Sequence, residues 1–83
     1  MRLIDSVLEA VNSSPEGTTT EIIANIIYGD LNQYTTEQAR NYRGSKINTK
    51  ARELWRQGYI MAIYEGKTPH WYPFNTDIKE AMI

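Results

Sequence analysis

Apolar residues recur at steps of three and four positions through residues 2–12, which predicts an amphipathic helix. They are Leu3, Ile4, Val7, Leu8 and Val11. A turn rich in Ser, Pro and Gly follows at residues 12–17. Four isoleucines then predict a second helix whose apolar stripe lies in the core; they are Ile22, Ile23, Ile26 and Ile27. Thr18 and Glu21 match a capping box for the start of this helix, and Gly29 is placed to end it.

The middle of the chain is open to two interpretations. A second capping-box pattern, Thr35 with Gln38, predicts a short extra helix around 36–43. The next apolar stripe consists of Ile47, Ala51 and Leu54. When the residues are projected at about 100° each, this stripe points in a different direction from the apolar residues of the short helix. We therefore expect a break at Gly44–Ser45, with Ser45 capping a separate helix over residues 45–57. One unbroken helix from 36 to 57 is the alternative.

The last third of the chain predicts a β-hairpin. Gly58 stands where a left-handed residue ends the preceding helix. Residues 59–64 are β-branched or aromatic, as in a strand, and a glycine-containing turn follows them. Residues 70–72 can return as the antiparallel partner strand, which Pro73 closes.

Together these elements predict a mainly helical α+β fold in a single domain over residues 1–83. Three helices form its core, and a hairpin over residues 59–72 covers the apolar face that they leave open. Trp55 and Trp71 are expected to seal the junction between the third helix and the hairpin. A short tail over 75–83 follows, with a further helix expected over 76–82.

The charge is unevenly distributed along the chain. The net charge is −1, yet residues 40–67 hold seven basic and two acidic residues, a local charge of +5. The remaining residues hold two basic and eight acidic side chains, a charge of −6. Because solvent screens charges beyond about 8–10 Å, a polyanion responds to the local charge rather than to the total. The basic half therefore favours contact with nucleic acid.

Composition excludes several classes of function. The absence of Cys and the single His rule out a disulfide framework and a Cys/His zinc site. The chain offers no spaced nucleophile and base and no phosphate-binding Gly loop, so we expect no enzyme activity and no cofactor. Asp5 interrupts the run that a signal peptide would need, and no stretch has the roughly 18–20 apolar residues of a membrane span. We expect a cytoplasmic protein without membrane contact, nucleoid-associated if it binds DNA.

The element order and two segments resemble the winged-helix family of DNA-binding domains. The segments are residues 18–27, as the second helix, and SKINTKARELWRQGYI at residues 45–60, as a recognition helix that continues into the wing. The resemblance implies sequence-specific binding of double-stranded DNA by a small transcriptional regulator. The helix over 45–57 would enter the major groove, and the wing over 59–72 would contact the backbone or minor groove. The connection over 30–44 is longer than is usual in that family.

The candidate DNA-binding residues follow from projecting the third helix with its apolar stripe toward the core. Thr49 and Arg52 would lie nearest the bases, with Lys46 and Arg56 on phosphates. Ser45 shares this face, Asn48 and Lys50 flank it, and Lys67 stands at the wing tip. Arg40 and Arg43 either extend the basic surface or pair with Glu37.

Two expectations concern partners. One recognition helix covers few base pairs, so two half-sites and a homodimer would supply specificity. The alternative function is a protein–protein interaction module that uses the same scaffold within a larger assembly, because a fold does not fix a function.

Overall fold

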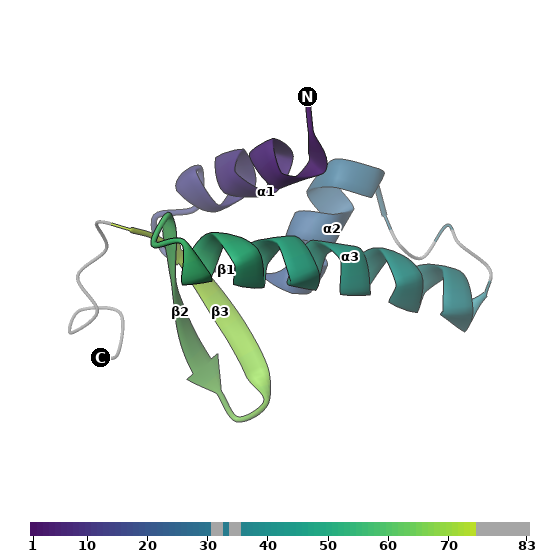
Figure 1. The fold of residues 1–83 in the computed structure, drawn as a ribbon. Coiled ribbons are helices and arrows are strands. Elements are labelled where there is room, and N and C mark those ends of the chain that lie inside the picture. Colours follow the sequence, from purple (N-terminus) through teal and green to yellow (C-terminus); the bar gives the residue numbers. More distant parts are fainter. Residues whose placement is uncertain (31–32, 34–35, 75–83) are drawn as a thin grey trace.

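Helices and strands follow one another in the order α1, β1, α2, α3, β2, β3 (Figure 1). The computed structural model describes residues 1–30, 33 and 36–74. The elements are α1 Leu3–Asn12, β1 Thr18–Thr19, α2 Thr20–Tyr28, α3 Glu37–Arg56, β2 Ile60–Glu65 and β3 Thr68–Pro73. This is the α+β layout that the sequence predicts. The expected tail over 75–83 and its helix over 76–82 lie outside the described residues. Among the described helices, none combines the length and apolarity needed to cross a bilayer.

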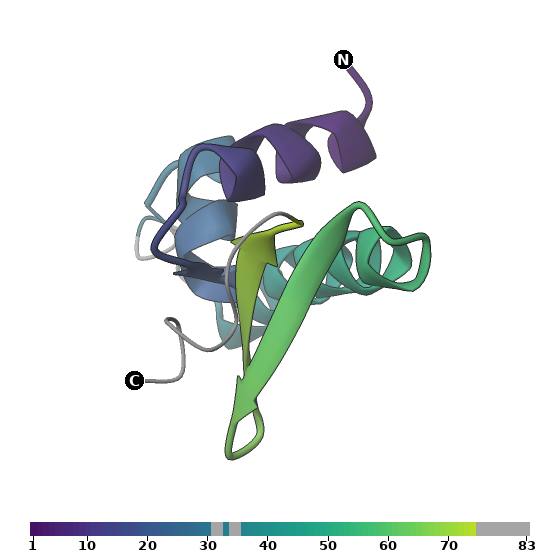
Figure 2. The same ribbon diagram turned by 90° about the vertical axis from the view of Figure 1, so that its left-hand side faces the viewer.

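The three strands form one antiparallel sheet in the order β1-β3-β2. Strands β2 and β3 make the predicted hairpin, in which Ala62 pairs with Trp71 and Glu65 with Thr68. The short β1 adds to the other edge of β3, where Thr18 pairs with Trp71. Figure 2 shows the hairpin projecting from the helices, with its turn farthest from α1. The sequence did not predict β1, because two residues are too few to show an alternating pattern.

One hydrophobic core joins all three helices to the sheet. Its members are Val7, Ala10, Val11, Ile23, Ala24, Ile47, Ala51, Leu54, Ile60 and Trp71. The predicted inward stripe of the third helix, Ile47, Ala51 and Leu54, is confirmed, since each is at most 3% exposed. The position of this stripe determines which face of α3 is left for solvent.

The expected break at Gly44–Ser45 is wrong, and the alternative of one long helix is correct. Helix α3 runs unbroken from Glu37 to Arg56, so the residues around 36–43 form its first turns rather than a separate helix. Its cap is Thr36, whose side chain accepts a hydrogen bond of 3.1 Å from the backbone N–H of Ala39. A glycine inside a helix costs only about 1 kcal/mol relative to alanine, which is less than the cost of ending one helix and starting another.

Two predictions about α2 need correction. The cap is Thr19, which accepts a hydrogen bond of 3.3 Å from the N–H of Ile22, whereas Thr18 is buried in β1. Only part of the isoleucine stripe lies in the core. Ile23 is fully buried, but Ile22 and Ile26 are 50% and 61% exposed. The apolar residues spread around more of this short helix than its packing partners cover.

The junction between α3 and the hairpin forms as predicted at Gly58. Its φ is +80°, its N–H donates to the carbonyl of Trp55, and the N–H of Tyr59 donates to the carbonyl of Leu54. This pair of bonds is the Schellman motif, which satisfies carbonyls at a helix end. Trp71 is fully buried beneath the junction, and Trp55 packs edge-on against it with ring centroids 6.3 Å apart. Trp55 nevertheless remains 41% exposed, so it covers the junction from outside.

Candidate nucleic-acid interface

The outer face of α3 carries a row of polar and basic side chains. Ser45, Thr49, Arg52 and Arg56 are spaced at four, three and four positions, and all four are exposed. Their spacing places them on the side of the helix opposite Ile47 and Ala51. We call these four residues the α3 ridge. Because the core fixes the rotation of the helix about its axis, the ridge cannot turn inward without exposing the buried stripe.

A groove runs along one flank of the ridge, between the start of α2, the middle of α3 and the turn of the hairpin. We call it the hairpin groove. Its lining includes Arg40 and Lys67, so α3 and the hairpin turn each contribute one cation. The other lining residues are Thr19, Thr20, Glu21, Asn41, Gly44, Ser45, Asn48, Thr68 and Pro69.

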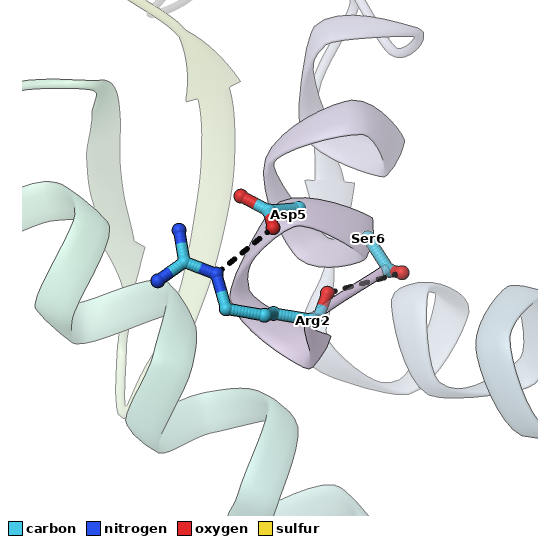
Figure 3. A network of polar contacts seen from close by, with 3 residues as sticks. All are labelled: Arg2, Asp5 and Ser6. Carbon is cyan, nitrogen blue, oxygen red and sulfur yellow. Dashed lines mark hydrogen bonds and ion pairs between the residues drawn. The ribbon is translucent and has the colours of Figure 1, made fainter.

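A second groove lies on the other flank, between the first turn of α1 and α3. We call it the α1 groove. It is lined by Arg2, Leu3, Ile4, Tyr42, Ser45, Lys46, Thr49, Lys50 and Glu53. In Figure 3 the Arg2 side chain folds back to Asp5, to which its Nε donates at 3.2 Å, while the Ser6 hydroxyl donates to the Arg2 carbonyl. Asp5 therefore offsets part of the positive charge at this end of the groove.

Several predicted cations make local contacts. The Lys46 ammonium lies 5.0 Å from the centre of the Tyr42 ring, and Lys50 forms an ion pair of 3.6 Å with Glu53. Both are surface contacts, each worth about 1 kcal/mol or less. A polyanion can therefore compete for these cations. Neither contact buries the charge.

Arg43 lies apart from the other candidates. It donates to the Ala39 carbonyl at 3.1 Å, and its guanidinium stands 5.8 Å from the centre of the Tyr28 ring at the end of α2. The structure thus brings nine of the ten predicted residues to the ridge or its two grooves. They are Arg40, Ser45, Lys46, Asn48, Thr49, Lys50, Arg52, Arg56 and Lys67.

One polar network in the hairpin groove was not anticipated from the sequence. The Trp71 indole N–H donates to the Thr20 hydroxyl oxygen at 3.0 Å, and the Thr20 hydroxyl donates to Asn48 Oδ1 at 3.4 Å. Thr20 did not stand out because its neighbours in sequence are also threonines. Only the packing of α2 against α3 and β3 selects it from among them.

Comparison with protein-family models, with curated proteins and with solved structures gave no match to this chain.

Proposed function

We propose that this protein is a winged-helix domain that binds double-stranded DNA, with α3 in the major groove and the β2–β3 hairpin as the wing. The element order and the antiparallel sheet support the proposed family. The further proposal of a small transcriptional regulator rests on the sequence resemblance and on the α3 ridge with its two grooves.

The observation that carries the proposal is the exposure of the α3 ridge beside a basic hairpin turn. Arg52 and Arg56 extend from the helix face opposite the core, and Lys67 stands on the hairpin turn across the adjoining groove. An α-helix fits the major groove of B-DNA, where arginine can donate two hydrogen bonds to guanine. A neighbouring cation on a hairpin can then contact the phosphate backbone.

The charge distribution supports the same orientation. The acids Asp5, Glu9, Glu16, Glu21 and Asp30 all belong to the first 30 residues, which form α1, β1 and α2. Most of the cations belong to α3 and the hairpin. A DNA duplex would therefore be attracted to α3 and the hairpin turn, while Glu21 in the hairpin groove and Asp5 at the end of the α1 groove offset part of this attraction.

Titration of labelled random-sequence duplex at several salt concentrations tests the proposal. Binding should weaken steeply as salt rises, because each neutralised phosphate releases counterions. Replacing Arg52 and Arg56 together by Gln should weaken binding roughly 10- to 100-fold, as expected for the loss of two arginine contacts. Equal binding by this double variant, or no binding by the original chain at low salt, would refute the proposal.

A matched variant controls for net charge. Asn12→Asp with Ser13→Asp also lowers the net charge by two, but at exposed positions at the end of α1. This variant should bind duplex nearly as well as the original chain. A similar loss in both double variants would mean that only the total charge matters.

A second candidate function is a protein-interaction module, and one observation favours it. Ile22 and Ile26 form an exposed apolar pair on α2, four residues apart. Replacing both by Gln should leave the fold intact, because neither belongs to the core. Sedimentation velocity of the original chain and of this double variant shows whether this face joins copies of the protein. A homodimer that dissociates on the change would place the partner surface on α2.

A further inference from the structure

The Trp71–Thr20–Asn48 network joins three elements at the floor of the proposed DNA-binding surface. Trp71 belongs to β3, Thr20 begins α2, and Asn48 lies in the middle of α3. The indole is fully buried, whereas Thr20 and Asn48 are half-buried and line the hairpin groove. The network therefore connects the core to a side chain that a ligand in the groove can touch.

The chemistry of the three groups sets the direction of each hydrogen bond. An indole N–H can only donate, so the Thr20 oxygen must accept from Trp71. The Thr20 hydroxyl proton then needs an acceptor of its own. Thr20 is the first residue of α2, so no carbonyl of a preceding helical turn is available to it. Asn48 Oδ1, at 3.4 Å, takes this role.

This arrangement commits the two halves of the Asn48 amide to different tasks. Its oxygen faces Thr20 and is engaged within the protein. Its NH2 group is left for the groove, with two N–H donors. A free asparagine could turn over and offer its oxygen instead, but here turning over would leave the Thr20 proton without its acceptor.

We propose that Asn48 is a specificity-determining residue that acts only as a hydrogen-bond donor toward DNA. The inference rests on the proposed function and assigns the chemistry of one position within that site. Asn48 would donate to the O6 or N7 atom of guanine, the base with two acceptors on its major-groove edge. It would not form the paired contact with adenine, because that contact needs the amide oxygen to accept from the adenine N6 amino group.

Substitutions at Asn48 test the donor role. Asn48→Ala removes the donors and should weaken duplex binding about tenfold, as for a hydrogen bond to a charged or buried acceptor. Asn48→Asp should weaken binding more than Asn48→Ala, because it places an anionic oxygen against an acceptor. Binding by Asn48→Asp that equals or exceeds that of Asn48→Ala would overturn the inference.

Thr20→Val tests the part played by the network. It removes the hydroxyl while keeping the side-chain shape, so the Asn48 amide can turn over. The ratio of affinities for an A·T-only duplex and a G·C-rich duplex should then shift toward A·T by about threefold or more, a modest change for one hydrogen-bond pair. Thr18→Val is the matched control, because the same change two residues away removes a hydroxyl that has no hydrogen-bond partner among the described residues. An unchanged ratio in Thr20→Val would contradict the inference.

Asn48→Ala also tests the sequence dependence of the contact. If Asn48 donates to guanine, the loss should be greater on the G·C-rich duplex. An equal loss on both duplexes would mean a phosphate contact, which carries no sequence information, and would overturn the inference. A greater loss on the A·T-only duplex would mean contact with an A·T pair and would overturn it as well.

A measurement without DNA separates the failure of this inference from the failure of the proposed function. In NMR spectra of the free protein, the Trp71 indole proton should exchange slowly with solvent. Its exchange rate should increase in Thr20→Val and stay the same in Thr18→Val. The Asn48 NH2 resonances should shift only in Thr20→Val. If these spectra behave as expected but no duplex binds, the DNA proposal fails. If duplex binds through Arg52 and Arg56 but the spectra do not change, the network fails alone.

Discussion

The ring of Tyr72 lies directly against the backbone of Gly17. A Cβ atom added to Gly17 would stand 2.6 Å from Cε1 of Tyr72, closer than side-chain atoms can approach one another. The φ of Gly17 is +95°, a conformation that L-residues rarely adopt. Only glycine therefore fits at position 17, where the turn before β1 packs against Tyr72 of β3.

Gly17→Ala should therefore lower the free energy of unfolding by about 2–5 kcal/mol, since overpacking costs about 1–3 kcal/mol and a positive φ costs about 1–2 kcal/mol. Gly66→Ala in the hairpin turn is the control. Its φ is also positive, at +63°, but an added Cβ would meet no neighbour, so its cost should stay near 1 kcal/mol. Urea denaturation of both variants measures the difference. Equal losses would show that the Tyr72 contact adds nothing.

Gly44→Ala should raise the stability by about 0.5–1 kcal/mol. Gly44 lies inside α3, where alanine is the better helix former and where an added Cβ has open space. The midpoint of urea denaturation should increase with no change in its slope. A loss of stability would indicate that the chain bends at this position, as the broken-helix prediction supposed.

Thr18→Val should stabilise the protein by about 1 kcal/mol. Thr18 is 3% exposed, and its hydroxyl oxygen makes no hydrogen bond within the described structure. An unsatisfied buried hydroxyl costs about 1–3 kcal/mol, which a methyl group of similar size avoids. Thermal unfolding followed by circular dichroism is the appropriate measurement. A lower melting temperature would mean that the hydroxyl has a partner after all.

Lys67→Gln should reduce the salt dependence of duplex binding. If Lys67 neutralises one phosphate, the slope of log affinity against log salt should fall by about 0.9. Arg43→Gln removes the same charge from α3, yet Arg43 stands over Tyr28 rather than on the ridge. Its slope should match that of the original chain. A reduced slope in Arg43→Gln alone would move the interface to the other side of α3.

The sequence predicted those features that depend on local periodicity and on single special residues. The steps of three and four located α1, and the stripe of Ile47, Ala51 and Leu54 gave the rotation of α3. Gly58 marked the change from helix to strand because a left-handed residue was needed there. Each of these depends on neighbours within a few positions in the chain.

The features that the sequence did not predict depend on contacts between distant segments. Strand β1 exists because Thr18 and Thr19 meet Trp71 and His70 across the chain. Ile22 and Ile26 are no less apolar than Ile23, and only the arrangement of α1 and α3 determines which of them is buried. Thr20 gained its place in the site in the same way. A local pattern cannot show which of several equivalent residues will face a partner.

The position of β3 between β1 and β2 has a consequence for synthesis on the ribosome. The segment that forms β1 leaves the ribosome early, but its partner strand is among the last of the described residues to be made. Until then the core lacks the indole of Trp71, the largest of its fully buried side chains. We expect the nascent chain to remain loosely packed until β3 emerges, and then to consolidate in a single step.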